Sequence, residues 1–306
     1  MKSQPAKTLR LALSRSSNLA GIALMLIGIF FFALNDAMGK FLIATFSVGQ
    51  ILLIRSAAAL VILIPFIWKE GWTPFRKAPR PWLQFWRPVF ATFEVAAFYW
   101  ALQYMSLADV MTFYLAGPIY VTAMSPFLLG ETVGWRRWVA VCAGFVGVMI
   151  ALNPTAASLT PAAFVAIAGS LAFSILMIQT RLVRGTSDTV LITTQTVGAL
   201  VFGAIVAPFQ WVPMSGWDTW LLLQLGVVAM VAHMCINRSL KVAPASVVVP
   251  YQYTTIVWAI VLGYIFFGDI PSVTMVIGAS TIIAAGIYIF VREQRLAKQT
   301  SFAEPP

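Results

Sequence analysis

Ten long apolar segments, separated by short polar stretches, dominate the chain. Most of them approach or exceed the roughly 20 residues that an α-helix needs to cross the hydrocarbon core of a bilayer. They lie near Leu19–Met38, Val48–Trp68, Gln84–Tyr104, Ala108–Leu129, Arg137–Leu152, Pro161–Arg181, Thr189–Gln210, Asp218–Arg238, Ala245–Gly268 and Ser272–Val291. The pattern predicts an all-α integral membrane protein with ten transmembrane helices.

Composition supports this prediction and excludes several other classes of protein. Of the 306 residues, 60% are hydrophobic and only 10% are charged, whereas soluble domains carry about a quarter charged residues. The net charge of +10 is spread over short loops and tails, so we expect no nucleic-acid partner. One histidine and two cysteines, Cys142 and Cys235, give no metal-binding motif, and we expect no metal and no cofactor.

Lys and Arg are distributed unequally between the two sets of loops. All but three of the 20 lie in the two tails or in the even-numbered loops, while Lys40 lies in an odd-numbered loop and Arg55 and Arg87 lie within segments. Cytoplasmic loops carry the excess of basic residues in membrane proteins. We therefore expect a multi-pass protein of the bacterial inner membrane, surrounded by lipids, with both termini in the cytoplasm.

The two halves of the chain repeat one pattern at a nearly constant separation. The matching pairs are Gly28 and Gly169, Phe32 and Phe173, Lys40 and Arg181, Ala59-Leu60-Val61 and Ala199-Leu200-Val201, and Gly130-Glu131 and Gly268-Asp269. Each half holds five segments, and because five is odd, the second copy must insert in the opposite orientation.

The repeat predicts four parts of the chain. We expect cytoplasmic tails at 1–18 and 292–306, a first five-helix repeat at 19–152 and an inverted second repeat at 153–291. In transporters built from inverted repeats, the substrate site lies between the repeats near the middle of the membrane. The sequence therefore predicts a central cavity that both repeats enclose.

Four short motifs carry a family resemblance. They are Arg55 within residues 50–56, Ala101-Leu102, Gly130-Glu131, and the segment 243–253 with its continuation through Trp258 to Gly268-Asp269. Together they resemble the drug/metabolite transporter superfamily, EamA type. The resemblance implies a ten-helix exporter of small metabolites, with a cavity between helices one to four and six to nine. Within that family, the chain is most similar to the YddG-type exporters of aromatic and other neutral amino acids.

These features favour a secondary transporter that works by alternating access and is not an enzyme. The chain has no GxxxxGK[ST] motif for ATP and no cluster of acids and histidines for catalysis, so we expect no catalytic residues. The expected substrate is a small molecule, with amino acids the first choice, and the expected process is export. An uptake permease, or an exporter of another small metabolite or drug, is the alternative because a fold does not set direction.

Polar side chains within apolar segments are costly, so each one is a candidate for the substrate site. Asn35 is one candidate lining residue. Arg55 either holds a substrate carboxylate or joins helices, and its repeat partner is Gln195. Glu94 either couples protons or binds a substrate ammonium, or else it forms a structural pair with Arg87 or Arg55.

Pseudo-symmetry adds further candidates. His233 and Asn237 share one helix face, and Asn237 matches Tyr99 in the first repeat. Tyr114 matches Gln252, and we expect both to face the cavity. The mid-segment aromatics can also suit flat or cationic substrates, or else face the lipid headgroups. They are Trp100, Tyr251, Tyr253 and Trp258.

Two further predictions concern structure rather than chemistry. Pro250 should break the ninth helix, and Asp36 should form an interfacial pair with Lys40. Small residues in the fifth and tenth segments, among them Gly144 and Gly147, favour close helix contact and are compatible with a homodimer.

Overall fold

All the regular structure described here is helical. The computed structural model describes residues 4–105, 107–152, 160–267 and 273–302. The elements of the first half are α1 (Gln4–Ile43), α2 (Val48–Glu70), α3 (Thr73–Arg76), α4 (Pro81–Leu102), α5 (Leu107–Tyr114), α6 (Gly117–Leu128) and α7 (Trp135–Leu152). Those of the second half are α8 (Pro161–Leu182), α9 (Asp188–Val206), η2 (Ala207–Gln210), α10 (Gly216–Val242), α11 (Ala245–Val248), η3 (Val249–Thr254), α12 (Thr255–Phe267) and α13 (Val273–Phe302). The all-α prediction is confirmed.

Six stretches of the described chain are long and apolar enough to cross a bilayer. They are Asn18–Ile43, Val48–Glu70, Pro161–Leu182, Asp188–Gln210, Gly216–Val242 and Ala245–Phe266. The other four expected segments also form helices, but their apolar stretches are shorter or interrupted. Arg87 and Glu94 interrupt α4, the fourth segment is split into α5 and α6, and Arg136 and Arg137 lie in the first turn of α7.

Local sequence explains where several helices begin. Four of them start after a Ser or Thr whose side-chain oxygen accepts a hydrogen bond from a backbone N–H three residues later. These residues are Ser47, Thr160, Ser187 and Ser215. Such caps satisfy donors that would otherwise stay unpaired at the helix ends.

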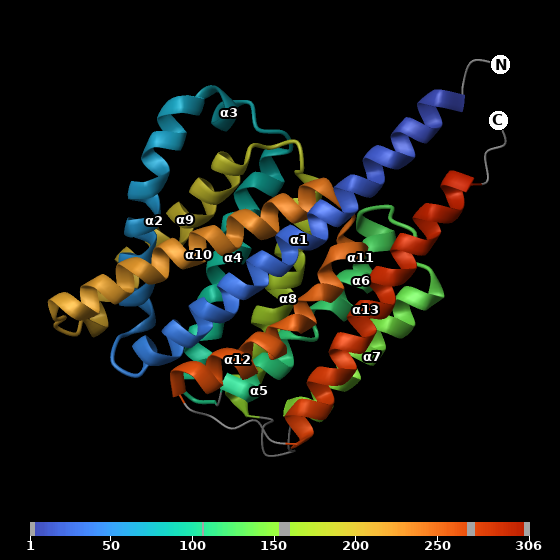
Figure 1. Cartoon of the computed structure of the whole chain (residues 1–306). Coiled ribbons are helices and arrows are strands. Elements are labelled where there is room, and N and C mark those ends of the chain that lie inside the picture. The colour runs from blue at the N-terminus through green and yellow to red at the C-terminus, as the bar shows by residue number, and fades with distance from the viewer. Residues whose placement is uncertain (1–3, 106, 153–159, 268–272, 303–306) are drawn as a thin grey trace.

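Helix packing follows the predicted repeat (Figure 1). The helices of the first half, α1, α2, α4 and α7, correspond to α8, α9, α10 and α13. The contact of α1 with α10 is matched by that of α8 with α4, while α2 packs on α9 and α7 on α13. α1 and α8 run in opposite directions, as expected for an inverted repeat (Figure 1). The motif Gly268-Asp269 lies outside the described residues.

Matched residues of the two repeats meet at these crossings. The rings of Phe32 and Phe173 lie edge to face with centroids 6.2 Å apart. Gly28 lets α1 approach α10, because a Cβ there would lie 2.8 Å from a side-chain carbon of Ile236. Its match, Gly169, lets α8 approach the hydroxyl of Tyr114 in the same way. The similarity between the halves is therefore expressed in packing.

Two of the membrane segments are broken at matching positions. The fourth changes direction between α5 and α6, just before Gly117 and Pro118, and the ninth passes through the 3₁₀ turn η3, which contains Pro250. The break predicted at Pro250 is thus present. Irregular backbone in a membrane protein needs a protein interior or a cavity beside it, so these breaks point to the place where a site can form.

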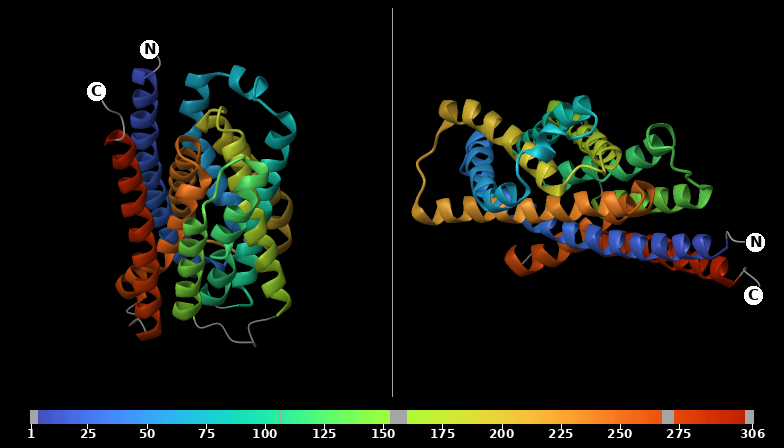
Figure 2. Two further views of the ribbon diagram at one scale, coloured as in Figure 1. Left: turned by 90° about the vertical axis from the view of Figure 1, so that its right-hand side faces the viewer. Right: turned by 90° about the horizontal axis from the view of Figure 1, so that it is seen from above.

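Both ends of the described chain lie at the same end of the bundle (Figure 2). We call this end the terminus-bearing face. It also carries α3 and the connections 129–134, 183–187 and 243–244 (Figure 1). Basic residues of these segments, among them Arg76, Lys77 and Arg184, therefore belong to this face.

Candidate functional site

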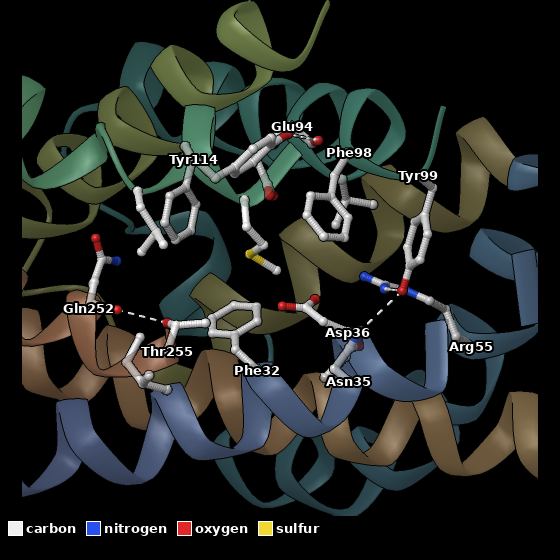
Figure 3. Close-up of a pocket in the computed structure, with 16 residues that line it drawn as sticks. Phe32, Asn35, Asp36, Arg55, Glu94, Phe98, Tyr99, Tyr114, Gln252 and Thr255 are labelled. Carbon is white, nitrogen blue, oxygen red and sulfur yellow. Dashed lines mark hydrogen bonds between the residues drawn. The ribbon is translucent and has the colours of Figure 1, made fainter. Parts of the chain in front are cut away.

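A pocket lies in the middle of the bundle, next to both broken helices, and we call it the central pocket. Its lining residues come from both repeats (Figure 3). They are Ile29, Phe32, Asn35, Asp36, Arg55, Glu94, Val95, Phe98, Tyr99, Met111, Tyr114, Leu115, Phe173, Ala229, Gln252 and Thr255.

The two helix breaks each place a polar side chain at the pocket. Tyr114 ends α5, and its hydroxyl donates a hydrogen bond to the backbone carbonyl of Glu94 at 2.9 Å. Gln252 lies in η3, where its backbone carbonyl accepts a hydrogen bond from the Thr255 hydroxyl at 2.7 Å. The matched pair Tyr114 and Gln252 therefore shares one pocket, in the positions that pseudo-symmetry predicts (Figure 3).

One end of the central pocket is built around a buried phenol. The Tyr99 hydroxyl accepts hydrogen bonds from Asn35 Nδ2 and Arg55 Nη1, both at 3.3 Å, and the Arg55 guanidinium lies 5.7 Å from the Tyr99 ring centroid. This is the single hydrogen bond that Arg55 makes within the described part of the chain. Because a guanidinium has five N–H donors, Arg55 keeps most of them for a bound anion.

Two carboxylates enter the pocket from opposite walls. Asp36 extends from α1 and Glu94 from α4, and both point toward the same space (Figure 3). Neither side chain accepts a hydrogen bond from any residue that the structure describes, and each lies within electrostatic reach of Arg55. The predicted interfacial role of Asp36 with Lys40 is thus replaced by a place in the pocket, because α1 turns this face toward α4.

Aromatic rings line the pocket from its middle to the end where Gln252 lies. Phe98 and Tyr114 are packed edge to face with centroids 5.1 Å apart, and Tyr114 lies 6.5 Å from Phe173. Phe173 in turn packs against Phe32. Arg55 therefore lies at one end of the central pocket, and aromatic rings extend from its middle toward the other end (Figure 3).

A smaller side chamber adjoins the pocket behind Arg55. Gln195 and His233 line this side chamber rather than the central pocket, and Arg55, Val95 and Ala229 belong to both spaces. The His233 ring packs against Phe32, with centroids 4.9 Å apart. His233 therefore supports the wall of the pocket from behind.

Asn237 lies away from the pocket and binds a buried arginine. Arg87 donates hydrogen bonds to the carbonyl of Leu191 at 2.7 Å, to Thr180 and Asn237 at 3.0 Å and to Gln195 at 3.1 Å. Asn237 lies two turns beyond Ala229 on α10, about 12 Å nearer the terminus-bearing face. Glu94 does not pair with Arg87, so the structural pairing considered for these two residues is absent.

Four aromatic candidates also lie outside the central pocket. Tyr251 and Tyr253 flank Gln252 in a 3₁₀ turn, where successive side chains point about 120° apart, so the turn sends them into the helix packing instead. Trp258 packs on Phe30 of α1 at 4.8 Å, and α1 covers that face. Trp100 is 38% exposed and lines an outer groove between α4 and α9.

Several residues of the pocket are not predicted by the sequence. The spacing of Asp36 and Lys40 favours an interfacial pair, and no motif marks the apolar lining residues Phe32, Phe98, Met111 and Phe173. The repeat match of Phe32 with Phe173 is a usable signal, because matched residues near a pseudo-symmetry axis meet each other.

Within the described residues, no three His, Cys, Asp or Glu side chains form a group that could hold a metal.

Glu131 forms a second polar cluster, at the terminus-bearing face. Gly130 adopts a φ of 66°, a backbone conformation that favours glycine, and the chain then turns so that Glu131 reaches the start of α11. Its carboxylate accepts bonds from the N–H groups of Ala245 and Ser246, both at 3.1 Å, and from the Ser246 hydroxyl at 2.9 Å. Arg181 of α8 pairs with the same carboxylate at 3.2 Å. We call these four residues, Glu131, Arg181, Ala245 and Ser246, the latch.

Curated relatives of the chain are membrane transporters. The chain is 23% identical over 278 residues to an S-adenosylmethionine uptake transporter of Rickettsia felis, covering 90% of this chain and 94% of the relative. It is 24% identical over 273 residues to a riboflavin transporter of Vibrio cholerae, covering 88% and 92%. These names fit the transport of another small metabolite better than the export of amino acids.

Fold comparison agrees with this sequence comparison. A solved crystal structure matches with a TM-score of 0.72 and 17% identity, over 92% of this chain and 98% of the other, which shows the fold alone. The sequence profile of the EamA-like transporter family matches residues 19–153 and 160–292, nearly the whole of both halves. The chain therefore belongs to the EamA-like transporter family.

Proposed function

We propose that this protein takes up a small metabolite that combines a flat ring with a net positive charge, and that S-adenosylmethionine is its substrate. The observation that carries the proposal is the set of charged groups in the central pocket, which are two carboxylates and one guanidinium. If Asp36 and Glu94 are both ionised, Arg55 offsets one of the two negative charges and leaves the other uncompensated. A buried charge without a partner is costly, so the pocket favours a ligand that brings one positive charge.

S-Adenosylmethionine meets this requirement. Its sulfonium and ammonium groups are positive and its carboxylate is negative, which gives a net charge of +1. Its adenine is a flat ring of the kind that the aromatic end of the pocket suits. The names of the Rickettsia relatives support the same substrate.

Riboflavin and neutral amino acids fit the charge less well. Riboflavin is uncharged, and a neutral amino acid is a zwitterion with no net charge, so either would leave one pocket carboxylate unpaired. Riboflavin is the second candidate because the aromatic lining suits its ring system and relatives of Vibrio and Rhizobium are named riboflavin transporters.

Alternating access supplies the mechanism of the proposal. Arg87 ties α4, α8, α9 and α10 together on one side of the pocket, and the latch ties the ends of α8 and α11 nearer the termini. We place this terminus-bearing face in the cytoplasm, because it carries most of the basic residues. Substrate then enters the pocket from the opposite face, and release requires the latch to open.

Counterflow in proteoliposomes tests the proposal. Vesicles loaded with unlabelled substrate should accumulate labelled S-adenosylmethionine, and Arg55→Gln should reduce this accumulation at least about tenfold by removing the partner of the substrate carboxylate. Excess unlabelled S-adenosylmethionine should compete, while riboflavin and phenylalanine should compete weakly. Accumulation of riboflavin but not of S-adenosylmethionine would replace the first candidate by the second.

A further inference from the structure

We infer that Asp36 and Glu94 form a binding site for a cationic onium centre, and that Glu94 makes the protein distinguish a sulfonium from a neutral sulfur. We call the two carboxylates the onium site. The inference rests on the proposed function only for the identity of the natural substrate. The site itself is argued from the geometry of the pocket.

The first step is the position of the two carboxylates. They extend from different helices toward one space, and no residue that the structure describes donates a hydrogen bond to either of them. Two like charges that face each other away from bulk water repel more strongly than they would in water. A positive group between them relieves that repulsion and replaces the missing partners.

The aromatic rings beside Glu94 indicate which kind of cation the site prefers. Phe98 and Tyr114 lie on either side of Glu94 (Figure 3). A sulfonium or quaternary ammonium donates no N–H hydrogen bond, and it is stabilised by nearby negative charge and by the faces of aromatic rings. Within the described residues no third His, Cys, Asp or Glu joins the pair as a metal ligand, so the surroundings suit an onium ion better than a metal ion.

The third step separates the two carboxylates by their neighbours. Asp36 lies beside Arg55 and Tyr99, and its chain neighbour Asn35 donates to the Tyr99 hydroxyl (Figure 3). Glu94, on the opposite wall, has the rings of Phe98 and Tyr114 as its neighbours (Figure 3). A substrate whose carboxylate binds Arg55 would therefore place its α-ammonium near Asp36 and leave Glu94 for a second cationic centre.

The groups around the pocket can then be compared with those of the substrate. Asp36 lies beside Arg55, and Glu94 faces Asp36 from the opposite wall, between Phe98 and Tyr114 (Figure 3). S-Adenosylmethionine carries its carboxylate and its ammonium on one carbon atom, which suits the neighbouring Arg55 and Asp36. Its sulfonium is therefore assigned to Glu94, whose neighbours are aromatic rings.

A neutral analogue provides the test. S-Adenosylhomocysteine lacks only the sulfonium methyl group and its charge. Binding of both ligands to the purified full-length protein in nanodiscs, measured by calorimetry, should favour S-adenosylmethionine by at least about tenfold. Glu94→Gln should bring the ratio of the two dissociation constants to within about twofold, whereas Asp36→Asn should weaken both ligands and leave the ratio unchanged.

Two controls show whether a changed dissociation constant reflects the loss of the Glu94 charge or a loss of folding. Glu70→Gln makes the same substitution at the end of α2, outside the pocket, and should change neither constant. Retained binding of S-adenosylhomocysteine shows that Glu94→Gln is folded. Equal binding of the two ligands by the unaltered protein, or an unchanged ratio in Glu94→Gln, overturns the inference even if S-adenosylmethionine is transported.

A simpler pair of probes covers the case in which S-adenosylmethionine does not bind, which would overturn the proposed function. Phenyltrimethylammonium and its uncharged carbon isostere, tert-butylbenzene, differ only in the charge of the central atom and contain no adenosyl group. Comparing their dissociation constants therefore tests whether the pocket prefers an onium cation. Preference for the cation that Glu94→Gln removes supports the onium site independently. Equal binding of both probes, or binding of neither, counts against it.

Discussion

The latch and the central pocket both contain carboxylates and an arginine, but their hydrogen bonding differs. In the latch, the carboxylate of Glu131 accepts three hydrogen bonds from the start of α11 and pairs with Arg181. In the pocket, the carboxylates of Asp36 and Glu94 accept none from the described part of the chain. A carboxylate whose bonds are all made within the fold holds helices together, whereas one that is buried without them is prepared for a ligand.

The two arginines within the membrane segments repeat the contrast. Arg87 directs its guanidinium to four acceptors on three other helices, while Arg55 makes one hydrogen bond, to Tyr99. Both side chains are less than a tenth exposed, so burial alone does not tell them apart. The number of hydrogen bonds already made separates the structural arginine, Arg87, from Arg55, which we propose binds substrate.

Arg87→Leu should have the largest effect, and it should act on stability. The substitution leaves the buried acceptors on Thr180, Leu191, Gln195 and Asn237 without their donor, and we expect a loss on the order of 3 kcal/mol or more. Thermal unfolding in detergent measures it. Arg80→Leu, at an exposed arginine with one bond to the carbonyl of Leu182, should shift the midpoint much less. Equal shifts in the two variants would contradict the structural role.

Arg55→Gln should affect substrate binding rather than stability. It removes the charge that faces the substrate carboxylate, so the dissociation constant for S-adenosylmethionine should rise by about 10- to 100-fold. The unfolding midpoint should stay near that of the unaltered protein, since Arg55 makes one hydrogen bond among the described residues. Calorimetric titration beside a melting curve measures both quantities. A melting point that falls as far as in Arg87→Leu would show that Arg55, like Arg87, mainly stabilises the fold.

Glu131→Gln should have an intermediate effect on stability. The amide has nearly the same shape but loses the charge that strengthens the bonds to α11 and Arg181, and we expect a loss of about 1–3 kcal/mol. Chemical denaturation of the purified protein reports it. Ligand affinity, by contrast, should change little, because the latch lies outside the central pocket. No loss of stability would mean that the latch contributes little to holding α8 and α11.

Phe173→Leu should have the smallest effect. It removes one ring from the aromatic end of the pocket, where a stacking or cation–π contact contributes about 0.5–1.5 kcal/mol, so affinity should fall a few-fold. The preference for the sulfonium over the neutral sulfur should remain, because Glu94 is unchanged. A lost preference with intact affinity would move the cation away from Glu94 and toward the rings.

Several features of the fold were predictable because they depend on length and period. Apolar segments of bilayer length predict helices in any membrane protein, and Pro250 has no backbone N–H with which to continue a regular helix. The matched positions of the two halves likewise predict that Tyr114 and Gln252 occupy related places. Each of these conclusions can be drawn from the order of residues along the chain, without knowledge of which helices contact each other.

The inward face of each helix was not predictable in the same way. A soluble helix shows its buried side by an apolar stripe, but a membrane helix is apolar on all sides, and lipid replaces water as the surrounding solvent. The sequence therefore favours an interfacial place for Asp36, which in the structure lines the pocket. It leaves Trp258 between the cavity and the headgroups, whereas the structure packs Trp258 on Phe30 of α1. One residue of rotation in η3 also decides that Gln252 rather than Tyr251 or Tyr253 meets the pocket.

The all-helical membrane fold, its two related halves and the helix break at Pro250 follow from the order of residues alone, because hydrophobic length, repeated spacing and proline chemistry can be recognised along the chain. Which charges are satisfied depends instead on how the helices pack. Glu131 and Arg87 find their partners on helices far away in the chain, while Asp36, Glu94 and Arg55 keep bonding capacity for a ligand. Whether a buried charge is structural or functional depends on distances that no spacing along one helix can set.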